Sequence, residues 1–121
     1  MSKKVLVVED TEDNRQILRD LLGTAGYQLV EAHDGAEGVA KATEHKPDLI
    51  LMDIQMPVMD GYEATRRIKA NPALKEIPVI AVTSYALSGD EEKARAAGCD
   101  GYIAKPFSPR QMLAKVREVI G

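Results

Sequence analysis

Carboxylates follow two of the most apolar runs in this 121-residue chain. Glu9 and Asp10 come directly after Val5–Val8, and Asp53 comes directly after Leu49–Met52. Carboxylates that gather at one place repel one another, so at neutral pH they need a cation or a proton. Oxygen ligands without His or Cys suit a hard divalent ion such as Mg²⁺. The three side chains therefore predict a magnesium site, provided that the fold brings them together.

Two further polar groups stand at the ends of later β runs. Thr83 ends the run Pro78–Thr83, and Lys105 follows Gly101–Ala104. A carboxylate beside a metal ion, a hydroxyl and an ammonium can attack a phosphoryl group, while the cations and donors stabilise the equatorial oxygens. Asp53 is the expected nucleophile because it lies at the mouth of a buried strand. The predicted chemistry is transfer of a phosphoryl group to an aspartate.

The elements that must position these groups alternate regularly along the chain. Continuous apolar runs predict strands over 5–8, 28–32, 49–52, 78–83 and 101–104. Helical spacing, caps and stop signals predict helices over 11–25, between 34 and Pro47, from 60 to before Pro72, over 88–98 and from 108 onward. This alternation predicts one α/β domain over residues 1–121, doubly wound around a five-stranded parallel sheet.

Several local details of these elements can be checked against a structure. The run 28–32 is more polar than the others and is expected nearer an edge of the sheet. Caps are predicted for four helices: Asp34 with Glu37, Asp60 with Glu63, Ser88 with Glu91, and Ser108 with Gln111. The first helix is expected to carry this apolar face: Ile17, Leu18, Leu21, Leu22 and Ala25. The second helix is expected to bury this narrow inner stripe: Ala36, Val39, Ala40 and Thr43.

The strand order decides whether the candidate residues meet. Ligands of doubly wound sheets bind beyond the carboxyl ends of the strands, where the strand order reverses. In one common order, 2-1-3-4-5, the first and third strands are neighbours at the reversal. Their carboxyl ends carry Glu9, Asp10 and Asp53, and the next two strands end near Thr83 and Lys105. This order predicts that all five side chains converge at one edge of the sheet.

An ordered set of residues along the whole chain resembles a two-component response-regulator receiver domain. The set is Glu9–Asp10, Asp53, Met56–Pro57, Asp60–Gly61, Thr83, Gly98, Tyr102 and Lys105–Pro106. One acidic pair would be a weak signal, but the complete set in its order is highly specific. The resemblance implies the flavodoxin-like receiver fold.

The resemblance also implies which residues bind metal and phosphate. Glu9, Asp10 and Asp53, joined by the backbone carbonyl of Gln55, would hold Mg²⁺ or Mn²⁺. Asp53 would accept the phosphoryl group from a phosphohistidine on a histidine kinase or on a histidine phosphotransfer protein.

The remaining members of the set are implied to contact the phosphoryl group and to transmit its presence. Thr83 and Lys105 would contact the phosphoryl group, and the Lys105–Pro106 bond is expected to be cis. Thr83 and Tyr102 would form a switch that alters a remote face of the domain. That face is expected to comprise the fourth helix, the fifth strand and the fifth helix, and to present Tyr102 together with Phe107.

The resemblance implies a signalling protein that is not a turnover enzyme. Because residues 1–121 are expected to contain no output module, the domain would act by docking to a kinase, a phosphotransfer protein or a downstream protein. Residues 77–83, 89–92 and 97–100 are similar to stand-alone receivers of the DivK type, which control cell division and polarity. They are also similar to receivers that form part of hybrid histidine kinases, or that act as phosphorelay shuttles. The sequence is compatible with each of these roles.

Composition argues against other classes of partner and site. The chain has 16 Lys and Arg against 19 Asp and Glu, a net charge of −3, so no nucleic-acid partner is expected. Its apolar runs of four residues are far short of the roughly 20 that a membrane span needs. Cys99 is the single cysteine, which excludes an internal disulfide and a Cys-based zinc site. A soluble cytoplasmic protein is the expected class.

Three rivals share the fold or the chemistry. A flavodoxin-like electron carrier needs a hydroxyl- and glycine-rich loop for its flavin phosphate, but four carboxylates follow the first strand, and the chain has no Trp to stack on the flavin. A dinucleotide-binding enzyme needs G-x-G-x-x-G at that same place, and the chain lacks it. An aspartyl phosphohydrolase usually carries its nucleophile after the first strand, whereas Asp53 follows the third.

Overall fold

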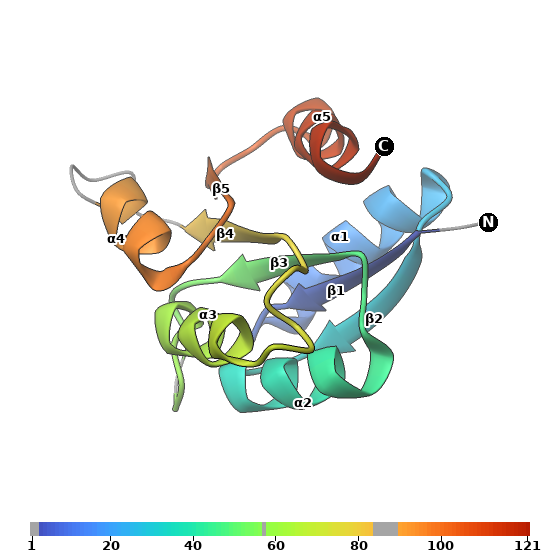
Figure 1. Cartoon of the computed structure of the whole chain (residues 1–121). Coiled ribbons are helices and arrows are strands. Elements are labelled where there is room, and N and C mark those ends of the chain that lie inside the picture. Colours follow the sequence, from blue (N-terminus) through green and yellow to red (C-terminus); the bar gives the residue numbers. More distant parts are fainter. Residues whose placement is uncertain (1–2, 57, 84–89) are drawn as a thin grey trace.

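The computed structural model describes residues 3–56, 58–83 and 90–121 of the chain (Figure 1). Its centre is a five-stranded sheet in the order β2-β1-β3-β4-β5, and every pair of neighbouring strands is parallel. The strands are β1 (Lys4–Val8), β2 (Gln28–Ala32), β3 (Leu49–Asp53), β4 (Val79–Thr83) and β5 (Gly101–Ala104). The predicted fold class and strand order are therefore confirmed.

The helices cover both faces of the sheet. They are α1 (Glu12–Thr24), α2 (Gly35–His45), α3 (Gly61–Ala70), α4 (Asp90–Ala97) and α5 (Pro109–Ile120). Helices α1 and α5 lie on one face, and α2, α3 and α4 lie on the other (Figure 1). Within the part of the chain that the structure describes, no helix combines the length and apolarity that crossing a bilayer requires.

Strand alternation divides the core into two layers. Val5 and Val7 pack with buried residues of α1 and α5, whereas Leu6 and Val8 pack with those of α2, α3 and α4. The central strands β3 and β4 are buried at every position, as their continuous apolar runs predict. Only Ala32 of β2 is fully buried, because this strand lies at an edge of the sheet.

Helix caps fix where three of the helices begin. In each cap a side-chain oxygen accepts a hydrogen bond from the backbone N–H three residues later. The pairs are Asp34 with Glu37 at 2.7 Å, Asp60 with Glu63 at 2.9 Å, and Ser108 with Gln111 at 3.1 Å. Ser88, the fourth predicted cap, lies outside the described residues. The described caps confirm that residues close to each helix start determine where these three helices begin.

The predicted inner stripe of α2 is wrong at Ala36, Ala40 and Thr43, whereas Val39 packs against the core as expected. The fully buried positions are Gly35, Gly38 and Ala42, while Ala36, Ala40 and Thr43 are exposed. The reason is the close approach of α2 to β1: a Cβ at position 38 would lie 2.9 Å from a Val8 methyl group. Glycine lacks the side chain that a search for apolar periodicity counts, so the stripe was placed on the wrong face.

We expect Gly38→Ala to destabilise the protein by about 1–3 kcal/mol, because the added methyl must displace Val8 or the helix. Urea unfolding measures the change. Gly23→Ala is the matched control, since a Cβ there meets nothing within 4 Å. This substitution should raise the free energy of unfolding by about 0.5–1 kcal/mol. Equal stabilisation by both substitutions would show that α2 does not approach the sheet closely.

Candidate functional site

Three carboxylates meet at the carboxyl ends of β1 and β3. Val8 pairs with Met52 in the sheet, so Glu9 and Asp53 follow neighbouring positions of adjacent strands. One oxygen from each of Glu9, Asp10 and Asp53 lies within 4.8 Å of the others. Glu9 is 2% exposed and Asp53 is 5% exposed, whereas Asp10 faces solvent. This cluster of hard oxygen donors, reachable from solvent through Asp10, has the chemistry that Mg²⁺ requires.

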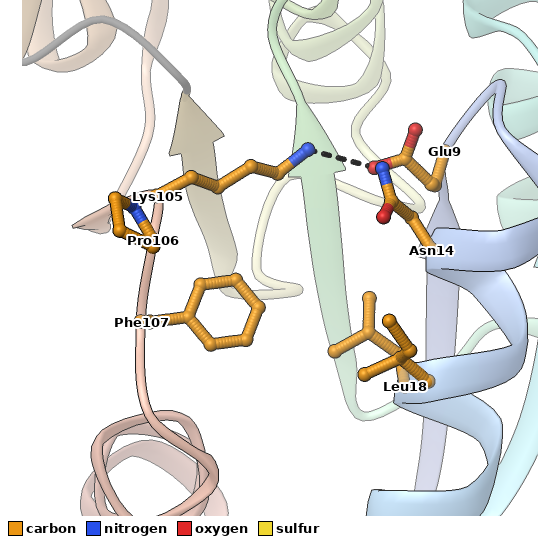
Figure 2. A pocket seen from close by; sticks show the side chains of 7 residues that line it. Glu9, Asn14, Leu18, Lys105, Pro106 and Phe107 are labelled. Carbon is orange, nitrogen blue, oxygen red and sulfur yellow. Dashed lines mark hydrogen bonds and ion pairs between the residues drawn. The ribbon is translucent and has the colours of Figure 1, made fainter.

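Lys105 brings a positive charge to the same place from the end of β5. Its Nζ donates a hydrogen bond to Glu9 Oε1 at 2.9 Å and lies 3.8 Å from Asp53 Oδ2. Figure 2 shows the side chain extending past the end of β3 to reach Glu9. The Lys105–Pro106 peptide bond is cis, as the resemblance implies. The ammonium therefore partly balances two buried carboxylates.

Burial and mutual repulsion set the protonation of the cluster. Burial alone would raise the pKa of Glu9, but hydrogen bonds from Lys105 and from the Thr11 N–H outweigh it and hold that pKa below its usual value. Burial and the nearby charge of Glu9 raise the pKa of Asp53 to about 7. Burial and Glu9 likewise raise the pKa of Asp10. Burial and the charge of Glu9 therefore favour the protonated form of Asp53.

The β3–α3 connection is built to pass close to Asp53. The Gly61 N–H donates to the Ile54 carbonyl at 3.1 Å, and a Cβ at position 61 would lie 2.8 Å from Ile54 Cα. Asp60 caps α3 at the same point. The pair Asp60–Gly61 therefore has a structural role, because it returns the chain against the end of β3. Pro57, also part of the quoted motif, lies outside the described residues.

Gln55 links the ends of β3 and β4. Its side-chain amide donates a hydrogen bond to Thr83 Oγ1 at 2.7 Å, and its backbone N–H donates to Asp53 Oδ1 at 3.2 Å. Thr83 is fully buried, while Gln55 is half-buried. A single residue thus contacts both the candidate phosphoacceptor and the candidate switch hydroxyl.

Tyr102 and Phe107 pack against opposite sides of the sheet. Tyr102 pairs with Ala81 and packs against the core layer of α2, α3 and α4. Phe107 packs against the other layer, beneath α1 and α5. Strand alternation places Tyr102, whereas Phe107 lies in the connection to α5 and follows that helix to the opposite side of the sheet. Only Tyr102 therefore lies on the side of β5 that α4 covers.

A groove adjoins the carboxylate cluster between α1 and the β5–α5 connection. It has a volume of about 460 Å³ and runs from Glu9 and Lys105 to Leu18 and Phe107 (Figure 2). Ile17, which belongs to the apolar face expected for the first helix, also lines the groove and is 57% exposed. This side chain borders the groove and is not part of either core layer.

Arg15 is a site neighbour that the sequence did not single out. Its guanidinium donates to the Glu9 backbone carbonyl at 2.7 Å and pairs with Glu12 at 2.6 Å. It also lies 3.6 Å from Glu31 on β2. The spacing of Glu12 and Arg15 signals only a helical ion pair, whereas the contact with Glu9 depends on how α1 sits against the sheet.

Comparison with known families and sequences gives a consistent result. The family model of the response regulator receiver domain matches residues 5–117. The polar-differentiation response regulator DivK of Brucella anthropi is 45% identical over 121 residues, which cover all of this chain and 98% of that protein. The DivK protein of Brucella ovis is equally similar over the same span.

Solved structures agree with the sequence relatives. The chemotaxis protein CheY4 of Vibrio cholerae superimposes with a TM-score of 0.94 at 32% identity, covering 99% of this chain and 100% of that one. The receiver domain of a sensor histidine kinase from Pseudomonas aeruginosa has a TM-score of 0.92 at 37% identity, covering 100% of this chain and 99% of that one. That structure has a magnesium ion coordinated in its active-site cleft.

Proposed function

This chain belongs to the response regulator receiver domain family, and from that premise we propose that Asp53 is its phosphoacceptor. Receiver domains are signalling proteins that accept a phosphoryl group on an aspartate. The observation that carries the proposal is the cluster itself, in which Glu9, Asp10 and Asp53 place oxygens within 4.8 Å and Lys105 lies 3.8 Å from Asp53. With the backbone carbonyl of Gln55, the three carboxylates would hold Mg²⁺ or Mn²⁺.

The proposed reaction uses these groups as follows. A carboxylate oxygen of Asp53 attacks the phosphorus of a phosphohistidine, an O–P bond forms, and the N–P bond breaks with its electron pair left on the imidazole. A bound Mg²⁺ supplies positive charge to the phosphoryl oxygens. Lys105 adds a second cation close to Asp53, and Thr83 provides a hydroxyl to a phosphoryl oxygen. Incubation with acetyl phosphate and Mg²⁺ should add one phosphoryl group, measured by intact-protein mass.

The proposed output is docking to another protein. The donor would be a histidine kinase or a phosphotransfer protein, and the receiver, as a single domain over residues 1–121, would act in the cytoplasm without being a turnover enzyme. Identity of 45% over 98% of a polar-differentiation regulator supports a role in cell division or polarity. A phosphorelay shuttle or a receiver of a hybrid kinase is the second candidate, which the likeness to the Pseudomonas kinase receiver supports.

Thr83 and Tyr102 would transmit phosphorylation to the partner surface. The two residues lie near each other on one side of the sheet, since Tyr102 pairs with Ala81 and Thr83 pairs with Ala104. Movement of Thr83 toward the phosphoryl group would open space beside β4, into which Tyr102 could turn. Tyr suits both positions because it has an apolar ring and a polar hydroxyl.

Phosphorylation should change the affinity for a kinase or phosphotransfer partner by roughly 5- to 150-fold, the usual range of allosteric coupling. Thr83→Ala should reduce this ratio toward one, because the hydroxyl connects the phosphoryl group to β4. Titration calorimetry with phosphorylated and unmodified protein measures both affinities. Thr43→Ala, at an exposed position of α2, is the control that should keep the ratio. Equal affinities in both states for every partner tested would contradict the switch.

A further inference from the structure

The side chain of Gln55 contacts the candidate switch hydroxyl of Thr83. Its amide nitrogen donates to Thr83 Oγ1 at 2.7 Å, a short hydrogen bond at a fully buried threonine. The backbone N–H of Gln55 donates to Asp53 Oδ1 at 3.2 Å. Gln55 is thereby anchored to the phosphoacceptor through its backbone and to the end of β4 through its side chain.

We propose that Gln55 is a positioning residue that holds Thr83 in the unphosphorylated arrangement. This inference rests on the proposed function, in which the Thr83 hydroxyl approaches a phosphoryl oxygen on Asp53. A phosphoryl group is an anionic acceptor, and it attracts a hydroxyl donor more strongly than a neutral group does. For Thr83 to move, its oxygen must leave the Gln55 amide. The amide therefore competes with the phosphoryl group for the position of this one side chain.

Thermodynamic linkage fixes the sign of the effect. A contact present only in the unphosphorylated arrangement stabilises that arrangement and weakens binding of any ligand that selects the other one. The net strength of a hydrogen bond between neutral groups corresponds to a factor of about 2 to 12 in an equilibrium constant. Loss of the Gln55 amide should therefore tighten the binding of a phosphoryl mimic by about this factor.

Two substitutions isolate the contact. Gln55→Met removes the amide donor, keeps a side chain of similar length, and leaves the backbone N–H and carbonyl of residue 55 in place. Thr83→Val removes the hydroxyl but keeps the branched shape. Gln16→Met, at an exposed position of α1, is the matched control for adding a methionine. The probe is beryllofluoride in the presence of Mg²⁺, a mimic of a phosphoryl group on a carboxylate, with its affinity measured by calorimetry.

The expected result is a double-mutant cycle with strong coupling. Gln55→Met should tighten beryllofluoride binding by about 2- to 12-fold in the wild-type background and leave it unchanged in the Thr83→Val background. The affinity for Mg²⁺ alone is measured for each variant, because the backbone carbonyl of residue 55 is a proposed metal ligand, and beryllofluoride affinities are compared at saturating Mg²⁺. A purely structural role would shift both affinities together.

The outcomes separate this inference from the proposed function. Unchanged or weaker beryllofluoride binding by Gln55→Met, with normal binding by the wild type, would overturn the role of Gln55 alone. The same effect in both threonine backgrounds would also overturn it, because the contact with Thr83 would then not carry the effect. Failure of the wild-type protein to bind beryllofluoride with Mg²⁺ would instead overturn the proposed function, and the role of Gln55 with it.

Discussion

Asp53→Asn is expected to reduce phosphoryl incorporation from acetyl phosphate to background. A carboxamide lacks the anionic oxygen that attacks phosphorus, and it binds Mg²⁺ more weakly than a carboxylate does. No other carboxylate of the cluster combines the burial of Asp53 with a place at the end of the central strand β3. Intact-protein mass after incubation with acetyl phosphate and Mg²⁺ measures the loss directly.

The matched control for this experiment is Asp20→Asn. Asp20 is an exposed aspartate of α1, so its replacement makes the same chemical change away from the carboxylate cluster. It should incorporate phosphate as the wild type does. Recovery of phosphate on a histidine or serine in the Asp53→Asn protein would falsify the assignment of the phosphoacceptor.

Lys105→Met is expected to destabilise the metal-free protein by about 3–5 kcal/mol at pH 8, the usual result of leaving a buried charge without its partner. Glu9 is 2% exposed, and Lys105 provides a hydrogen bond of 2.9 Å that helps to keep its pKa low. Without this ammonium, Glu9 and Asp53 remain as two neighbouring buried carboxylates. Urea unfolding in the presence of a chelator measures the change.

The pH dependence of this effect has a definite sign. Folding lowers the pKa of Glu9 in the wild type, and this contributes stability at pH values above the pKa of Glu9 in the unfolded chain. The contribution is lost as the pH falls through the pKa of Glu9 in the folded protein. Asp53 acts in the opposite sense, because folding raises its pKa to about 7. The free energy of unfolding therefore falls as the pH rises from the pKa of Asp53 in the unfolded chain toward 7. Loss of Lys105 should raise both pKa values. The destabilisation should therefore be largest at pH 8 and smaller at pH 5.

Three companion measurements test the electrostatic cause. Asp53→Asn should have the opposite sign and stabilise the metal-free protein by about 2 kcal/mol at pH 8, since it removes the carboxylate whose pKa is raised. Lys93→Met, on the exposed surface of α4, should change little. Saturating Mg²⁺ should return part of the stability lost in Lys105→Met. Equal unfolding free energies for the wild type and Lys105→Met at pH 8 would contradict the pairing.

The sequence by itself determined the fold and the candidates for chemistry. The strands β3 and β4 are continuous apolar runs, and Asp34, Asp60 and Ser108 cap their helices through contacts three residues away. Periodicity and capping are local properties, so they are readable without the tertiary structure. Parallel strands end at the same edge of the sheet. The convergence of Glu9, Asp53, Thr83 and Lys105 therefore follows from alternation and strand order.

The tertiary structure decided the contacts between those residues. It pairs Lys105 more closely with Glu9, at 2.9 Å, than with Asp53, at 3.8 Å, and it joins Gln55 to Thr83. It also turned the glycine face of α2 toward the sheet and left Ile17 exposed in a groove. These features depend on the distance and rotation between elements that are far apart in sequence. Such distances arise from packing of the whole core, which no local pattern of residues specifies.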